Sequence, residues 1–450
     1  MTRYPIPPYV RRIMTALLEA GHEAYLVGGC VRDLLLETRP KDWDVATSAW
    51  PKEVMALFPR TVPTGARHGT VTVIMFGHPV EVTTFRTEWG YSDHRRPDQV
   101  KFTRSLKEDL TRRDLTVNAM AMTLEGQVID YYGGRADLAG RLLRAVGRPE
   151  ERFEEDALRM MRTVRFAAQL GFSVEDETFE ACKKKAPLIE KVSRERIRDE
   201  LSKMLLSDRP GYAMELLRIT GLLEFIIPEL LEGVGCLQNE HHKYPVWEHS
   251  LIALDAVPPR LELRLAALLH DIAKPRCLTV ENGERHFYHH ENVGADMAWD
   301  ILRRLRFDNH TVETVTHLIR QHMALHYQPD MTDSAVRRLI RRVGLEYIGD
   351  LIELRRADRE ASGLKEGPVS RGTRKLLRRI EKVLEEDAAF GLKDLVVNGH
   401  DVMEKAGIGP GPAVGEILNY LLEQVLENPE LNERETLLKM IEEKAREMGL

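Results

Sequence analysis

The stretch that decides the fold is residues 28–47, GGCVRDLLLETRPKDWDVAT. A short apolar run, AYLV, precedes the two glycines and a helical pattern, VRDLLLE, follows them, which predicts a strand, a glycine turn and a helix. Glycines in such a turn let backbone N–H groups approach a phosphate, and a helix N-terminus favours an anion. Arg32 lies in the first turn of the predicted helix. We therefore expect Gly29 and Arg32 to bind a phosphate-bearing ligand.

Two carboxylates, Asp42 and Asp44, end the same stretch. DWDVAT predicts a short strand, in which alternate side chains point to one face. Paired carboxylates on a rigid face suit Mg²⁺, which prefers oxygen ligands and takes the rest from phosphates and water. Glu81, on the following hairpin, is a candidate third ligand. The alternative is a solvated strand edge with two acids, but the preceding glycine turn and arginine favour a metal site.

The flanking patterns predict an α+β fold, with a small mixed sheet in a head followed by a long all-helical remainder. Strands are expected at 69–76 and 79–85, joined by Gly77 and His78, and in NAMAMTL and QVIDYY. Residues 9–21 predict an amphipathic helix, and the polar segment 86–104 predicts a mobile loop. Beyond residue 134 the pattern is helical, except for one possible strand near 277–288.

Bulk composition excludes several classes of protein. The net charge is −6 in 450 residues, which argues against coating nucleic acid through bulk positive charge but allows a local basic groove. Apolar runs are shorter than the roughly 18 residues of a membrane span, and the N-terminus lacks a signal-peptide pattern. The four cysteines form no CxxC pair, so we expect reduced thiols and a cytoplasmic protein.

Three motifs carry a family resemblance: GGCVRDLLL…KDWDVAT, RRDLTVNAMA (112–121) and EEDALRMMRTVRFAAQLGF (154–172). In this order they resemble the class II tRNA nucleotidyltransferases and bacterial poly(A) polymerases, within the DNA polymerase β superfamily. The resemblance implies a polymerase-β-like head. It also implies that Asp42 and Asp44 are catalytic and hold Mg²⁺, which activates a 3′-hydroxyl and steadies the leaving pyrophosphate.

The resemblance implies that Glu155, Asp156 and Arg159 act as a protein template for the incoming base. Cytosine and adenine both present an amino donor beside a ring-nitrogen acceptor, which match a carboxylate and a guanidinium. Uracil and guanine present a carbonyl and an N–H there, and an unpaired buried polar group costs about 1–3 kcal/mol. Because Asp156 and Arg159 are three residues apart, we expect them to be neighbours on one helix.

The resemblance also assigns Arg113, Arg162 and Arg165 to nucleotide binding, and we expect Asp114 to buttress Arg113. Each three-residue step turns about 60° around a straight helix, so Arg165 would lie nearly opposite Asp156. The alternative for Arg165 is a salt bridge that supports the motif. Residues 86–104 resemble the family's flexible loop at full length, which argues against an enzyme that adds only CC; an ordinary exposed loop is the alternative.

Eleven of the sixteen histidines lie between residues 241 and 326, which suggests a metal site. His270 and Asp271 are adjacent in an apolar helix, where such a pair is unexpected unless it is paired or liganded. With His249 and Asp358 they resemble the HD phosphohydrolase superfamily. This resemblance implies that the four residues hold a second divalent transition metal, with His290 assisting, and that the site acts on phosphoesters at RNA ends. A retained fold with a decayed or structural site is the alternative. The remaining histidines in this region are expected to be surface or packing residues: His241, His242, His310, His317, His322 and His326.

These patterns predict four parts: a nucleotidyltransferase head (1–145), a helical neck that binds nucleotide and RNA (146–228), an HD-type helical domain (229–365) and a helical tail that binds tRNA (366–450). The partners implied are a tRNA 3′ end, CTP and ATP, without a membrane. The function implied is addition of CCA without a nucleic-acid template. An A-adding enzyme that acts only on tRNA ending in CC is a close rival, and an HD metal-dependent RNA-end phosphohydrolase is the rival from another class.

Overall fold

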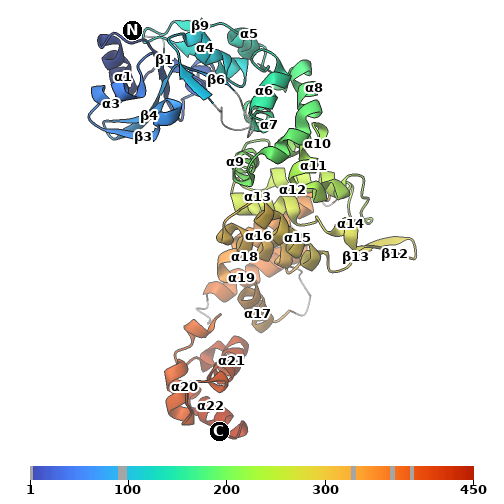
Figure 1. Cartoon of the computed structure of the whole chain (residues 1–450). Helices are drawn as coiled ribbons and strands as arrows, with labels where there is room; N and C mark the ends of the chain where they lie inside the picture. The colour runs from blue at the N-terminus through green and yellow to red at the C-terminus, as the bar shows by residue number, and fades with distance from the viewer. Residues whose placement is uncertain (1–3, 90–98, 326–330, 365–369, 386–389) are drawn as a thin grey trace. The chain divides into compact units, whose positions relative to one another are not determined.

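The computed structural model describes residues 4–89, 99–325, 331–364, 370–385 and 390–450. The chain divides into two compact units (Figure 1). The first unit comprises Met1–Leu231 and Arg303–Phe307, and the second comprises Glu232–Leu302 and Asp308–Leu450. The division into four parts stays a prediction.

The first unit contains a mixed sheet of seven strands in the order β3-β4-β5-β2-β1-β8-β9. Strands β1, β3, β4 and β9 of this sheet are labelled in Figure 1. Strands β2 and β5 pair in parallel and the other neighbours pair antiparallel. The strands are β1 (Ala24–Val27), β2 (Asp44–Thr47), β3 (Thr61–Gly65), β4 (Thr70–Met75), β5 (His78–Thr84), β8 (Met120–Met122) and β9 (Val128–Asp130). The predicted α+β class with a small mixed sheet is confirmed.

The hairpin of β4 and β5 follows from its sequence. Alternating β-branched residues bury Val71, Val73, Val80 and Val82 on one face. The turn is one residue earlier than expected: Met75 pairs with His78, and the turn residues Phe76 and Gly77 have φ of 51° and 82°. A two-residue turn with two positive φ angles matches the twist of the strands.

The segment 86–104 differs from the predicted loop. Its two ends form β6 (Arg86–Trp89) and β7 (Gln99–Phe102), which pair antiparallel. Thr87, Val100 and Phe102 are residues that favour strands, a signal that the polar composition of the segment obscured. Residues 90–98, the centre of the predicted loop, lie outside the described residues.

Helices α1 and α3 pack on β4, α2 packs on β1 and β8, and the rest of the first unit is mainly helical. Two two-residue strands, β10 (Leu142–Leu143) and β11 (Ser173–Val174), pair in parallel within this region. The helices are α1 (Pro8–Glu19), α2 (Gly29–Leu35), α3 (Pro51–Leu57), α4 (Leu106–Thr111), α5 (Gly134–Ala139), α6 (Pro149–Glu155), α7 (Leu158–Leu170), α8 (Asp176–Lys185), α9 (Arg194–Leu205), α10 (Pro210–Ile219) and α11 (Leu222–Ile226).

In the described residues of the second unit, the structure is helical apart from one hairpin, β12 (Leu278–Glu281) with β13 (Glu284–Phe287), in the region where a strand was expected. The tail helices α20 to α22 surround an apolar cluster that includes Val402, Leu421 and Ile441. The helices are α12 (Val246–Ala256), α13 (Leu261–Leu269), α14 (Lys274–Cys277), α15 (His290–Arg304), α16 (Asn309–Gln321), α17 (Asp333–Val343), α18 (Leu345–Ala361), α19 (Arg371–Glu385), α20 (Gly399–Ala406), α21 (Pro412–Glu427) and α22 (Arg434–Glu447). Among the described residues, no helix has the length and apolar character needed to cross a membrane.

Candidate functional sites

The glycine turn lies against the first candidate metal ligand. Strand β1 runs into Gly28, whose φ of 75° favours glycine. A Cβ atom at this position would lie 3.0 Å from Arg113 Nη1 and 3.7 Å from Asp44 Oδ2. The absence of a side chain therefore lets the turn, the arginine and the carboxylate approach one another.

Asp44 is the first residue of β2, and the parallel pairing of β2 with β5 places it opposite Glu81. Asp42 is exposed and precedes the strand, so the expectation that both acids lie on one strand is wrong. The negative charges of Asp42 and Glu81 nevertheless both act on the Asp44 carboxyl group. The pKa of Asp44 is raised to about 6: burial raises it most, Arg113 lowers it, and the charges of Glu81 and Asp42 also raise it. A bound cation would stabilise the ionised form against this burial and repulsion.

Most of the predicted nucleotide-binding residues line one cavity of about 440 Å³. Its lining includes six of the seven, together with Asp44, and Asp42 and Arg165 do not line it. The six are Gly29, Arg32, Arg113, Asp156, Arg159 and Arg162. The cavity also takes in Arg112, Asn118 and Arg196.

Asp114 connects the second motif to the third. Arg162 donates to its Oδ2 from Nε at 2.8 Å, and Asn118 Nδ2 lies 3.3 Å from its Oδ1. Asn118 Oδ1 in turn accepts from Arg32 Nη1 at 2.8 Å. The expectation that Asp114 buttresses Arg113 is wrong, because Arg113 pairs with Asp109 at 3.4 Å instead.

Asp156 lies at a break between two helices. Helix α6 ends at Glu155, Asp156 has extended backbone angles, and α7 begins at Leu158. The expectation that Asp156 and Arg159 share one helix is therefore wrong, although both line the cavity. The carboxylate of Asp156 accepts two hydrogen bonds from Arg196, at 3.1 and 2.8 Å, and one from the Leu158 N–H at 3.1 Å.

Arg159 is fixed by acceptors from three places. Its Nη2 donates to the Arg112 carbonyl at 2.8 Å and its Nη1 to the Arg152 carbonyl at 3.1 Å. It also forms an ion pair with Glu155. These contacts hold the guanidinium at the cavity wall, so Glu155 is placed to orient Arg159 rather than to face the cavity itself.

Arg165 is buried against the neighbouring helix α9. Its Nε donates to Glu200 Oε2 at 2.6 Å, and its guanidinium lies 4.1 Å from the centre of the Phe166 ring. Burial opposes the charge on Glu200, but Arg165 holds the pKa of that carboxyl below its usual range. This arrangement favours the alternative in which Arg165 forms a salt bridge that supports the motif, rather than a contact with the nucleotide.

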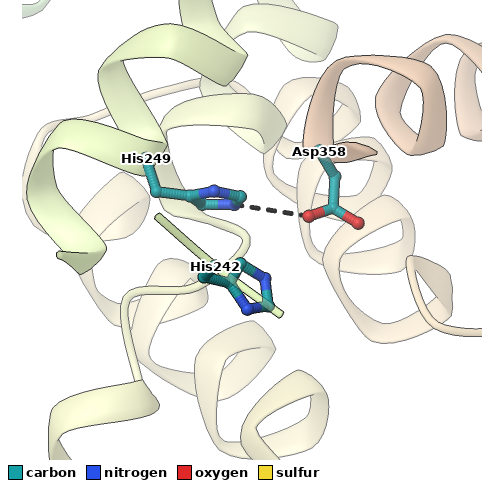
Figure 2. Close-up of side chains that lie close together, drawn as sticks. All are labelled: His242, His249 and Asp358. Atoms are coloured by element: carbon teal, nitrogen blue, oxygen red, sulfur yellow. Dashed lines mark ion pairs between the residues drawn. The ribbon is translucent and has the colours of Figure 1, made fainter. Parts of the chain in front are cut away.

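The second unit brings together the four residues predicted to hold the other metal. His249 lies on α12, His270 follows the last residue of α13, Asp271 comes next, and Asp358 lies on α18. His249 Nε2 lies 3.2 Å from His270 Nε2, 3.3 Å from Asp271 Oδ2 and 3.3 Å from Asp358 Oδ1. Figure 2 shows His249 and Asp358 facing each other from their two helices, beside His242. Their buried imidazole and carboxylate groups suit a divalent transition metal.

Two further histidines belong to this cluster, contrary to expectation. His242 and His322 were expected at the surface or in packing, but each lies in a group whose candidate ligand atoms are within 4.8 Å of one another. The groups are His242 with His249 and Asp358, His249 with His270 and Asp271, and Asp271 with His290 and His322. No sequence spacing identifies His242 and His322 as candidate ligands, because the segments that bring them together are distant in the chain.

Two histidines of this cluster, His322 and His242, have strongly lowered pKa values. Burial lowers the pKa of His322 to about 3, assisted by His270, and burial and Lys274 lower that of His242 to about 3. Burial and the neighbouring cations leave both imidazoles neutral, which is the form that binds metals. Among the described residues, no comparable group of three ligand atoms forms around Asp42, Asp44 and Glu81.

A second cavity, of about 520 Å³, opens onto the histidine cluster. Asp271, His290, His322 and Asp358 line it, and so do four basic side chains. These are Lys274, Arg285, Arg355 and Arg359. Arg355 Nη1 donates to Asp358 Oδ2 at 2.7 Å. A cavity with this lining suits an anionic ligand.

The role of Arg165 is open to a direct test. Replacing Arg165 with Met should lower the free energy of unfolding by about 3 kcal/mol, because it leaves the buried Glu200 carboxylate without its main partner. The KM for nucleotide should change little. Urea unfolding and steady-state kinetics measure both quantities, with Arg162→Met as the matched cavity-lining variant. Adding Glu200→Met should recover part of the lost stability. A large rise in KM with unchanged stability would instead make Arg165 a nucleotide contact.

Comparison with known proteins identifies the family. Residues 24–144 match a family model described as "Poly A polymerase head domain", residues 171–233 match "Probable RNA and SrmB- binding site of polymerase A", and residues 286–441 match a model of tRNA nucleotidyltransferase domain 2. The CCA-adding enzyme of Ligilactobacillus salivarius is 36% identical over 441 residues, 96% of each chain. That of Lactiplantibacillus plantarum is 37% identical over 433 residues, 95% of this chain and 93% of its own.

A solved structure agrees with these relatives. The crystal structure of the Bacillus stearothermophilus CCA-adding enzyme in complex with CTP matches with a TM-score of 0.74 and 32% identity, over 99% of both chains. The resemblance carried by the three motifs is confirmed, whereas the HD-type site stays a prediction. The chain belongs to the family of CCA-adding enzymes, which are tRNA nucleotidyltransferases.

Proposed function

We propose that this chain adds C, C and A to the 3′ end of tRNA from CTP and ATP, using the cavity of the first unit. The observation that carries this proposal is that all three sequence motifs meet in one cavity, which contains Asp44, the glycine turn and the Asp156–Arg159 pair. A cavity lined by six arginines and the half-buried carboxylate of Asp44 suits a nucleoside triphosphate, because its phosphates need cations and its metal ion needs an acidic ligand.

The carboxylates of Asp42 and Asp44 would hold Mg²⁺, with Glu81 beside them. The raised pKa of Asp44 supports this assignment, since a buried carboxylate crowded by two other acids is stabilised by a cation. When bound, Mg²⁺ lowers the pKa of the attacking 3′-hydroxyl and neutralises charge on the leaving pyrophosphate. Arg32 and Arg113, with the N–H groups of the glycine turn, orient the phosphates. Catalysis then depends on positioning and charge neutralisation.

Asp156 and Arg159 would read the base. Arg159 is held by three acceptors, so its remaining N–H donors point in a fixed direction. Arg196 donates two hydrogen bonds to the Asp156 carboxylate. A carboxylate has enough lone pairs to accept a further hydrogen bond from a base. Cytosine and adenine supply the amino donor and the ring acceptor that such a pair requires.

The finer assignments rest on the same site. An enzyme that adds only A to tRNA ending in CC would use the same residues, so the substrate panel below separates the two. We assign tRNA binding to the neck (146–228) and the tail (366–450). The basic stretch 337–344 is a weaker candidate for binding tRNA, since Arg338 already pairs with Glu423 and Glu427 of α21.

We place the protein in the cytoplasm, which its four free thiols support.

A substrate panel tests the main proposal. Purified chain with Mg²⁺ receives tRNA ending at the discriminator base, after C and after CC, with labelled CTP, ATP, UTP or GTP. We expect addition of both C residues and then A. Replacing Asp42 and Asp44 with Ala should lower the rate on the order of 10³-fold, because the metal platform is lost. Glu19→Ala, which removes an exposed acid of the same unit, is the control. Addition of A alone, and only after CC, would identify an A-adding enzyme, and no addition to any end would overturn the proposal.

Base choice gives an independent test. Asp156→Asn replaces an acceptor with a group that also donates, so it should no longer reject the O4 carbonyl of uracil. The preference for CTP over UTP, measured as the ratio of kcat/KM values, should fall on the order of 10-fold or more, the equivalent of one mismatched polar contact. Glu151→Gln, on the exposed side of α6, should leave the ratio unchanged. An unchanged ratio in Asp156→Asn would remove Asp156 from base reading.

The histidine cluster favours a second function, hydrolysis of a phosphoester at an RNA end. His249, His270, Asp271 and Asp358 would hold a divalent transition metal, as their four ligand atoms converge in a buried site. Such a metal polarises a phosphoester and supplies a nucleophile from water. The basic lining of the adjacent cavity, with Lys274 and Arg285, would bind the phosphate.

This second function has its own assay. The chain with Asp42→Ala and Asp44→Ala, supplied with Mn²⁺ or Ni²⁺, should still open 2′,3′-cyclic phosphate ends of RNA or release terminal phosphate. Asp271→Asn should reduce product to background, because it removes a carboxylate ligand that lies close to both His249 and His270. His310→Ala, which changes an exposed histidine of α16, should leave product formation unchanged. Product formation that survives both chelation and Asp271→Asn would refute the assignment, as would inactivity of the parent chain with every metal.

A further inference from the structure

A buried carboxylate outside the cavity of the first unit binds two arginines that line it. Asp109 lies on α4 with its side chain fully buried, and it does not line the cavity itself. Its Oδ1 accepts from Arg112 Nε at 3.1 Å, from Arg112 Nη2 at 2.7 Å and from the Arg86 N–H at 3.3 Å. Its Oδ2 lies 3.4 Å from Arg113 Nη2. Burial opposes the charge of Asp109, but Arg112 and Arg113 keep its pKa below the usual range.

Arg113 lies between this carboxylate and the proposed metal ligand Asp44. A Cβ atom at Gly28 would be 3.0 Å from Arg113 Nη1 and 3.7 Å from Asp44 Oδ2, so the two charged groups are close neighbours. Although burial raises the pKa of Asp44, the charge of Arg113 lowers it. Among the described residues, however, the only carboxylate that forms an ion pair with Arg113 is that of Asp109. The guanidinium thus has two carboxylates nearby and pairs with the one outside the cavity.

The position of Arg113 leaves part of its hydrogen-bonding capacity unused. Its Nε is buried and has no hydrogen-bond partner in the part of the chain that the structure describes, and its bond to Asp109 is long. A buried donor without an acceptor costs free energy, so this guanidinium would gain from a further oxygen ligand. The phosphates of a nucleotide could supply that oxygen, and so could Asp44. A salt bridge between Arg113 and Asp44 would occupy a phosphate-binding arginine and a metal-binding carboxylate together.

We infer that Asp109 is a positioning residue, which keeps Arg113 from closing onto Asp44. The inference rests on the proposed function, because it takes Arg113 as a phosphate contact and Asp44 as a Mg²⁺ ligand. While Asp109 holds the arginine, Arg113 keeps N–H donors for a triphosphate and Asp44 keeps its oxygens for the cation. In this role Asp109 touches neither the nucleotide nor the metal ion, and it acts only through Arg113.

A double-mutant cycle between Asp109 and Arg113 tests this role. In Asp109→Asn, which keeps the shape of the side chain and an acceptor for Arg112, Arg113 should pair with Asp44. The Kd of CTP, measured by calorimetry on the full chain in EDTA, should rise on the order of 10-fold, the effect of one charge-assisted hydrogen bond. The Mg²⁺ concentration for half-maximal addition of C to tRNA should also rise on the order of 10-fold, with most of kcat recovered at saturating Mg²⁺.

Arg113→Met separates the two effects. It removes a phosphate contact and should raise the Kd of CTP, but it also removes the competitor of Mg²⁺, so the Mg²⁺ requirement should not rise. When Asp109→Asn is added to Arg113→Met, either quantity should change by less than about 2-fold, because the arginine through which Asp109 acts is absent. A residue that only stabilised the fold would not produce this pattern.

Equal effects of Asp109→Asn with and without Arg113 would overturn the inference. A lower melting temperature with unchanged CTP affinity and Mg²⁺ requirement would overturn it too. A parent chain that binds no CTP would overturn the proposed function as well, whereas a parent that binds CTP and adds C to tRNA leaves that function intact whatever Asp109 does. Circular dichroism checks the fold of each variant. If Asp109→Asn does not fold, Asp109→Glu keeps the buried charge and displaces it by one methylene, and it should raise both quantities to a smaller extent only when Arg113 is present.

Discussion

The structure of the arginine-lined cavity in the first unit depends on a chain of hydrogen bonds through one buried carboxylate. Arg32 of the first motif donates to Asn118, Asn118 lies beside Asp114, and Asp114 accepts from Arg162 of the third motif. Arg162 and its hydrogen bonds keep the pKa of Asp114 far below its usual range against strong desolvation. Three motifs separated by long stretches of sequence are thus held around one cavity by charge-assisted hydrogen bonds, which are stronger than neutral ones.

The same network explains how so many arginines coexist. Arg112 and Arg113 share Asp109, Arg162 has Asp114, and Arg196 has Asp156. Each pair offsets repulsion between neighbouring guanidinium groups and leaves N–H donors along the cavity wall. A polyanionic ligand would enter a cavity whose cations are already oriented, so little ordering of side chains would oppose binding.

Sequence predicted six of the seven strands of the mixed sheet, the β4–β5 hairpin among them, and most of the cavity lining, because those features depend on local pattern and on motifs. It missed the edge strand β3. Prediction from sequence failed where the position of a side chain depends on a partner that is distant in the chain. Asp156 and Arg159 have helical spacing, yet Asp156 leaves the helix, where its carboxylate caps α7 and pairs with Arg196 of α9. Asp114 follows Arg113 in the sequence, but its carboxylate pairs with Arg162 of α7. His242 and His322 carry no local signal, since their place in the histidine cluster depends on how distant helices pack.

The histidine cluster is built largely at helix ends, which has a thermodynamic consequence. His270 and His322 follow the last residues of α13 and α16, and their Nδ1–H groups donate to carbonyls of the final turns, where the last carbonyls of a helix need partners. The Ile319 carbonyl also accepts the backbone N–H of His322. The same bonds that cap the helices therefore aim the imidazoles before any ion arrives. Little rotamer entropy would remain to be lost if a cation bound there, and the partial negative charge of each helix end would add to the attraction. The geometry of the cluster is therefore set by where the helices end, before any ligand is bound.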